Sequence, residues 1–190
     1  ADDLMVANNV ISVRAKSGED DAKARGILCY NDLMSGRIVH NTLVSDSTES
    51  DKDCAIEVRS SHLSTFYVSI QNNILVGRDS TASYGFYNGE ADSNPDYSNN
   101  VCFGVSTPVY GPASGSGNEH EAADKFEPVF AEGWDEDLSD GDQVDYRPTG
   151  TESGTYAVDE CPLVDGVDVD IRGVSRPHGG ACDRGAYEVE

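Results

Sequence analysis

The chain has 190 residues, with 13 Lys plus Arg against 35 Asp plus Glu, and a formal net charge of −22. A field of that sign repels phosphate backbones and anionic lipid headgroups, so we expect no nucleic-acid partner and no membrane insertion. The longest apolar runs are only a few residues, too short to span a bilayer, and the apolar content excludes disorder throughout. High acidity suits a soluble extracellular surface or the capture of divalent cations.

The first half of the chain repeats one pattern, in which an asparagine precedes a short apolar, β-branched run. Asn9, Asn41 and Asn73 are 32 residues apart, and a weaker fourth copy contains Asn100. Short strands at residues 26–30 and 55–59 form a second row. Because strands this short cannot bury their inward side chains alone, the repeat predicts a parallel β-solenoid whose stacked coils share one core.

Asparagine suits the corners of such coils, because it tolerates the left-handed backbone and its side-chain amides can hydrogen-bond up and down a stack. We therefore expect a structural ladder of four residues. The apolar positions that follow should align in rows. The ladder residues are Asn9, Asn41, Asn73 and Asn100; the two rows are Ile11, Leu43, Leu75 and Cys102, and Val10, Thr42, Ile74 and Val101.

The five cysteines show neither a CxxC pair nor zinc-like spacing. Cys161 and Cys182 bracket a tail with little core of its own, so a disulfide between them is our hypothesis. It would close a loop of about 20 residues and add roughly 3 kcal/mol on the chain-entropy estimate. The odd count leaves at least one thiol unpaired, and Cys29 fits a small core residue better than a nucleophile.

The coil Asn72-Asn73-Ile74-Leu75-Val76-Gly77 resembles the right-handed parallel β-helix proteins of the pectate-lyase-like superfamily. The tail sharpens this likeness: Asp170-Ile171-Arg172-Gly173-Val174-Ser175-Arg176-Pro177 precedes Cys182-Asp183-Arg184-Gly185-Ala186-Tyr187-Glu188. That order is similar to the C-terminal part of secreted bacterial β-helix proteins of the choice-of-anchor Q type. The resemblance implies an all-β, right-handed parallel β-helix in an extracellular or cell-surface protein.

Two regions are expected: parallel β-helix coils over 1–105 and an irregular, acidic C-terminal capping region over 106–190. A β-helix has open ends whose unpaired backbone groups invite association, and the tail is the expected cover for the C-terminal end. The first coil is expected to be incomplete. Either the solenoid continues upstream, or another copy of the chain covers that edge by strand addition.

Some proteins of this superfamily cleave acidic polysaccharides, with a basic residue or a carboxylate set as the catalytic groups. The candidates here are Asp32, His40, Glu57, Arg59 and His62. No catalytic motif surrounds them, and a structural role is favoured for each; His40, which replaces an asparagine beside the corner, is expected to join the stacked ladder. We therefore assign no catalytic residue.

An acidic run in the second half suggests calcium, because its carboxylates alternate around Gly141. The candidate ligands are Asp135, Asp137, Asp140, Asp142 and Asp145. The order of an EF-hand loop is missing, and a solvated loop is the favoured alternative.

The sequence thus favours a non-catalytic extracellular or cell-surface solenoid, acting as a structural, adhesive or self-assembling module with glycan or protein contact along a strand face. A calcium-assisted polysaccharide lyase or glycoside hydrolase is the alternative. The fold alone does not choose between them.

Overall fold

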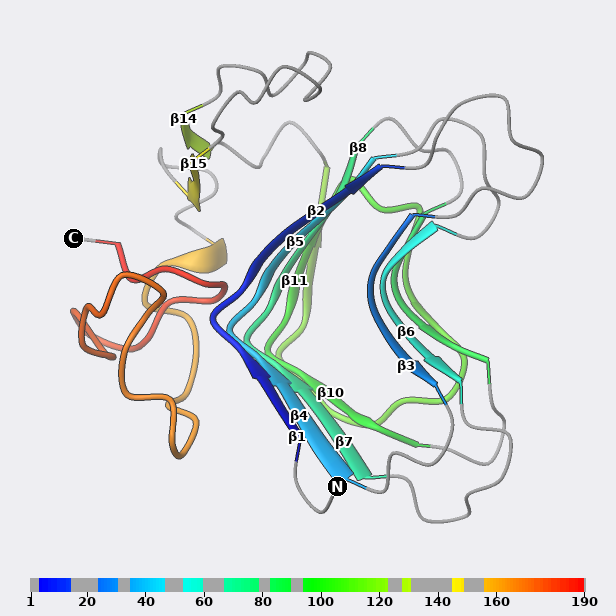
Figure 1. Ribbon diagram of the computed structural model, residues 1–190, viewed down its shortest axis with the longest axis horizontal. Coiled ribbons are helices and arrows are strands. Elements are labelled where there is room, and N and C mark those ends of the chain that lie inside the picture. The colour runs from blue at the N-terminus through cyan, green and yellow to red at the C-terminus, as the bar shows by residue number, and fades with distance from the viewer. Residues whose placement is uncertain are drawn as a thin grey trace.

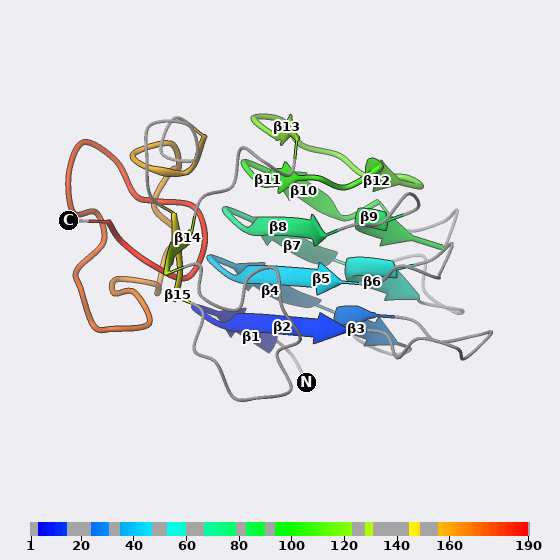
Figure 2. The ribbon, with the colours of Figure 1, turned by 90° about the horizontal axis from the view of Figure 1, so that it is seen from above.

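The computed structural model describes residues 4–14, 24–30, 35–46, 53–59, 67–78, 83–89, 94–122, 128–130, 145–148 and 156–189. The described chain is all-β and forms a parallel β-solenoid, as the repeat predicts. Three parallel sheets surround one core (Figure 1). Each of the first four coils contributes one strand to each sheet, and a fifth adds the strand Glu119–Glu121 to one of them. The coils lie in layers one above another (Figure 2).

Each sheet has a fixed strand order. Sheet 1 contains β1 (Leu4–Ala7), β4 (Ser35–Val39), β7 (Tyr67–Gln71) and β10 (Asp96–Ser98). Sheet 2 contains β2 (Val10–Arg14), β5 (Thr42–Asp46), β8 (Ile74–Arg78), β11 (Val101–Phe103) and β13 (Glu119–Glu121). Sheet 3 contains β3 (Arg25–Tyr30), β6 (Asp53–Arg59), β9 (Ser83–Asn88) and β12 (Thr107–Tyr110). A separate antiparallel pair joins β14 (Pro128–Phe130) and β15 (Asp145–Pro148).

The register of sheet 2 confirms the two rows expected from the repeat. Ile11, Leu43, Leu75 and Cys102 are aligned from coil to coil, as are Val10, Thr42, Ile74 and Val101. The first row packs into the core between the three sheets, together with Ile56, Ile70 and Phe86. The second row faces outward, where Ile74 and Val101 pack with Ala157 of the tail.

The ladder of asparagines lies at the corner between sheets 1 and 2. The backbone N–H and Nδ2 of each asparagine donate to Oδ1 of the next at 2.9–3.0 Å, from Asn9 through Asn41 and Asn73 to Asn100. Asn118, which the repeat does not predict, accepts from Asn100 at 3.0 and 3.2 Å and extends the row. The buried amides thus satisfy one another.

The left-handed backbone belongs to the residue before each ladder asparagine. It occurs at Asn8, His40, Asn72 and Asn99, with φ between +53° and +58°. His40 therefore lies in this corner row and not in the ladder where the sequence places it. A polar side chain suits this position because it can form hydrogen bonds near the turn where the backbone is left-handed.

The tail, residues 156–189, lies along the outer side of this corner and not over the end of the coils, on the left in Figure 1. It contacts the first coil, where Asn8 Nδ2 donates to the carbonyl of Val169 at 2.7 Å. It also contacts the last described coil, where Arg184 Nη2 donates to the carbonyl of Gly117 at 3.1 Å. These residues therefore do not form the cap over the end of the coils that we expected. They pack instead against polar side chains of the corner and against the apolar row that faces outward from sheet 2.

The coils also extend beyond the expected boundary at residue 105, because β12 pairs with β9 and β13 pairs with β11. This last coil is hard to predict from the sequence, because Ser, Gly and Pro stand where the earlier coils have apolar runs. Within the described residues, no helix is long and apolar enough to cross a membrane.

Candidate functional site

A groove crosses the outer face of sheet 1 at the start of its strands. Its volume is about 450 Å³, and its lining comes from four successive coils. Alternation along β7 explains the lining: Val68 and Ile70 point into the core, so Tyr67 and Ser69 point outward. The other lining residues are Ser35, Gly36, Arg37, Val68, Asn94, Pro95, Asp96 and Ser114.

Tyr67 is the most exposed large side chain of the groove, with 71% of its surface accessible. Arg37 is held beside it by a hydrogen bond from Nη1 to the carbonyl of Asp165 in the tail, at 2.8 Å. Asp96 Oδ2 accepts from Gln71 Nε2 at 2.7 Å. An accessible ring, a guanidinium, a carboxylate and several hydroxyls therefore meet in one concave surface, the combination with which proteins bind polar organic ligands.

A second aromatic surface lies on the outer face of sheet 3. The rings of Tyr87 and Tyr110 stack with centroids 4.8 Å apart, and Tyr84 meets each of them edge-on at 5.3 and 5.4 Å. Burial raises the pKa of Tyr87. Sequence reasoning missed this cluster, although the positions of Tyr84 and Tyr87 on β9 and of Tyr110 one coil later were the available signal.

Among the described residues, the candidate catalytic side chains are not gathered into an accessible site. Glu57 is 1% exposed, and its carboxylate forms ion pairs with both Arg25 and Arg59. His40 is fully buried beneath the tail, and burial lowers its pKa to about 3. Asp32 and His62 lie outside the described residues.

The calcium hypothesis stays a prediction. Asp135, Asp137, Asp140 and Asp142 lie outside the described residues, and Asp145 is described only as the first residue of β15.

The charged positions of the tail motif come together in one buried cluster. Arg176 forms an ion pair with Glu188, and both side chains are fully buried. Arg176 also donates to the carbonyls of Asp183 and Gly185, both at 2.9 Å, and to Asn8 Oδ1 of the first coil at 3.1 Å. Glu188 N–H donates to Asp170 Oδ2 at 3.0 Å. The motif thus folds the tail and joins it to the coils.

Two further contacts fix the tail against the corner row. Gly185 N–H donates to the carbonyl of Asn72 at 2.8 Å, and Ala186 N–H donates to Thr42 Oγ1 at 3.1 Å. Gly185 has φ +86°, and a Cβ there would lie 2.7 Å from both Thr42 Oγ1 and Ile74 Cδ1. Only glycine combines that backbone with so close an approach.

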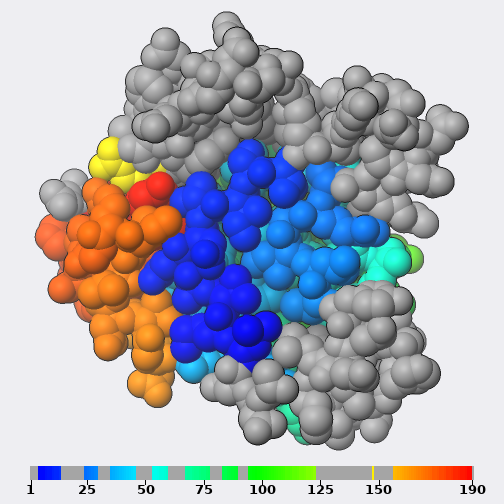
Figure 3. Space-filling model, viewed as in Figure 1, coloured from blue at the N-terminus to red at the C-terminus, as the bar shows by residue number. Residues whose placement is uncertain are grey.

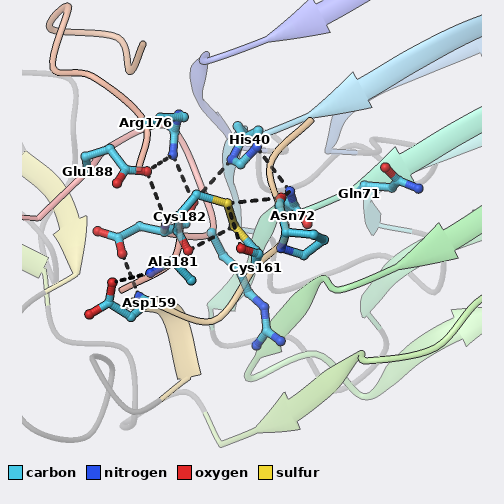
Figure 4. The surroundings of a disulfide bond; sticks show 12 residues. His40, Gln71, Asn72, Asp159, Cys161, Arg176, Ala181, Cys182 and Glu188 are labelled. Carbon is cyan, nitrogen blue, oxygen red and sulfur yellow. Dashed lines mark hydrogen bonds and ion pairs between the residues drawn. A yellow bond between two sulfur atoms is a disulfide. The ribbon is translucent and has the colours of Figure 1, made fainter. Parts of the chain in front are cut away.

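Cys161 and Cys182 form a disulfide, which closes the loop of the tail beside His40 (Figure 4). His40 Nδ1 lies 3.2 Å from the carbonyl of Asp183, and His40 Nε2 lies 3.1 Å from Asn72 Nδ2. The remaining cysteines, Cys29, Cys54 and Cys102, are buried free thiols. The disulfide and the charged cluster together make this corner the best-connected polar region of the described chain.

Comparison with known proteins found no matching family model, no matching curated protein and no matching solved structure.

Proposed function

We propose that this chain is a non-catalytic, extracellular β-solenoid module that binds glycans in the groove of sheet 1. Its parallel coils and its tail motif also support membership of the secreted β-helix proteins of the choice-of-anchor Q type, within the pectate-lyase-like superfamily. The observation that carries the proposal is the exposed ring of Tyr67 inside a groove where hydrogen bonds hold Arg37 and Asp96 in place. An aromatic ring packs against the C–H face of a sugar, while hydroxyl, amide and charged groups bond its hydroxyls.

The charge of the molecule supports a glycan over other extended ligands. At a net charge of −22, nucleic acid and anionic lipid are repelled, whereas an uncharged polyhydroxyl chain is not. The lining of the groove comes from four successive coils. The groove therefore extends along the solenoid axis, a shape that suits a polymer. Most of its lining residues belong to strands β4, β7 and β10, which limits the ordering cost of binding.

A polysaccharide lyase or hydrolase is the less favoured alternative. An acid–base residue must reach the reacting atoms and exchange a proton with them. Glu57 is instead enclosed by two guanidinium groups, and His40 lies beneath the tail. Neither Glu57 nor His40 is therefore placed to exchange a proton with a sugar bound in the groove.

The test is affinity for a panel of soluble polysaccharides, measured by titration calorimetry on the wild type and on variants of the groove. Tyr67→Ala should weaken binding about tenfold, or about 1.4 kcal/mol. Tyr67→Phe should retain most of the affinity because it keeps the ring.

Tyr110→Ala is the matched control, because it removes a half-exposed tyrosine from sheet 3, away from the groove. Equal losses for Tyr67→Ala and Tyr110→Ala would contradict the assignment to sheet 1. Release of reducing or unsaturated sugar ends by the wild type would overturn the non-catalytic proposal.

A further inference from the structure

Three ligand atoms of the kind that zinc prefers lie together under the tail. A ring nitrogen of His40 and the Sγ atoms of Cys161 and Cys182 all lie within 4.8 Å of one another. His40 and Cys182 are fully buried and Cys161 is 4% exposed. Zinc sites in proteins use cysteine sulfur and histidine nitrogen in such sets of three or four.

His40 is the one residue of the corner row that is neither asparagine nor glycine, since Gly117 precedes Asn118 with φ +74°. The equivalent residues of three other coils are Asn8, Asn72 and Asn99, all with the same left-handed backbone. The imidazole of His40 therefore stands where three other coils have an asparagine side chain, and it lies beside Cys161 and Cys182 (Figure 4). Backbone geometry does not require a histidine here, since asparagine serves the same conformation on three other coils.

The surroundings of His40 match those of a metal-binding histidine. Its Nδ1 lies against the backbone carbonyl of Asp183, which leaves the lone pair on Nε2. A hydrogen bond of this kind to the second ring nitrogen accompanies metal-binding histidines and fixes their tautomer.

A fourth donor is present beside the ring. Asn72 Nδ2 donates to His40 Nε2 at 3.1 Å and to the carbonyl of Pro162 at 2.8 Å, so a metal on Nε2 would replace the first of these bonds. Asn72 Oδ1, on the same side chain, is buried without a hydrogen-bond partner in the described residues. A buried amide oxygen left without a partner costs free energy, and a cation would remove that cost.

From these contacts we infer that His40, Cys161 and Cys182 form a latent site for a zinc-like divalent cation, which opens when the disulfide is reduced. A phosphine and one water molecule reduce the S–S bond: the phosphorus takes the water oxygen and becomes a phosphine oxide, and the two water hydrogens go to the sulfur atoms, which become thiols. The cation then binds the two sulfur atoms as thiolates and releases both protons, while His40 Nε2 adds a neutral ligand. The metal replaces the disulfide as the cross-link that holds the tail.

The other cysteines do not compete for the metal. Burial raises the pKa of Cys29 to about 11 and the pKa values of Cys54 and Cys102 to about 12. Within the described residues, none of these three thiols belongs to a group of three or more side chains that could hold a metal ion. Thiolate coordination in the folded chain therefore reports on Cys161 and Cys182.

Cobalt absorption spectroscopy tests the site. The full chain is reduced with a phosphine, freed of it anaerobically, and titrated with Co²⁺ in excess Ca²⁺, which occupies the surface carboxylates. The reduced wild type should bind one Co²⁺ with thiolate-to-cobalt charge-transfer bands, and Zn²⁺ should displace it. The oxidised protein should show no such bands.

His40→Asn is the decisive variant, because it keeps the corner conformation and removes only the imidazole. It should weaken cobalt binding at least tenfold, since loss even of an outer hydrogen-bond partner costs roughly 10- to 100-fold in metal affinity. A Cys161→Ser, Cys182→Ser double variant, with circular dichroism to confirm the β fold, should abolish the charge-transfer bands. Unchanged affinity in His40→Asn, or a reduced wild type without charge-transfer bands, would overturn the inference.

Discussion

At the scale of single residues, His40 and Asp183 are buried groups whose pKa values move toward each other's ordinary range. Burial lowers the pKa of His40 from 6.5 to about 3 and raises the pKa of Asp183 from 3.8 to about 6. Arg176, Glu188 and Asp159 are the charged groups that face this pair. Between about pH 4 and pH 6, the folded chain keeps the proton on Asp183 and the unfolded chain keeps it on the histidine.

Their effects on stability should therefore cancel in the wild type over that range. A lowered histidine pKa makes the free energy of unfolding rise with pH, and a raised carboxyl pKa makes it fall, each by about 1.4 kcal/mol per pH unit. Relative to wild type, His40→Asn should lose stability from pH 4 to pH 6, and Asp183→Asn should gain it. Urea unfolding at three pH values measures both slopes; slopes of the same sign would contradict these assignments.

At the scale of elements, the asparagine ladder links the corners of strands that are far apart in the chain. Asn73 donates from its backbone N–H and from Nδ2 to Asn100 Oδ1, and Nδ2 also donates to the carbonyls of Ile38 and Gln71. Its Oδ1 accepts twice from Asn41. Asn9, at the start of the row, is only partly buried and no donor from a preceding coil reaches it in the described residues.

We expect Asn73→Ala to cost about 3 kcal/mol or more, because it leaves several buried donors and acceptors without partners. Asn9→Ala should cost about 1 kcal/mol, because water reaches its neighbours. Chemical denaturation of the two variants measures the difference. Equal losses would show that the ladder contributes little beyond the local turn.

At the scale of the whole molecule, the first coil differs from the others in exposure. Val6, Ile11 and Ile27 are only partly buried, although they are aligned with Ile38, Leu43 and Ile56, which are at most 3% exposed. The strands β1, β2 and β3 are also the outermost strands of their three sheets. Figure 3 views the molecule on this face, where β1 and β2 are dark blue.

Such a face, with apolar side chains and unpaired strand edges, promotes strand addition by a second copy. We expect concentration-dependent association of the 190-residue chain in sedimentation equilibrium. An Ile11→Lys substitution should shift the equilibrium toward monomer, because a charge would then be buried at the contact. A wild type that stays monomeric at all accessible concentrations would show that this edge is covered.

Much of the fold was predictable from the spacing of particular residues. The 32-residue interval between Asn9, Asn41 and Asn73 determined the coil length, the alignment of the apolar rows and the ladder itself, because a stacked coil must return to the same place each time. The positions of Cys161 and Cys182 at the two ends of a short segment could also be seen in the sequence. The structure contains the disulfide that this spacing predicts.

Only the tertiary structure decided where the tail lies and which polar groups it brings together. Arg176 meets Asn8 across 168 residues, and His40 meets Asp183 across 143, and no local spacing encodes such contacts. The groove around Tyr67 and the enclosure of Glu57 arise in the same way, from side chains on successive coils. Repetition determines what recurs along the chain, whereas packing against a non-repeating tail determines which of the repeated positions becomes a site.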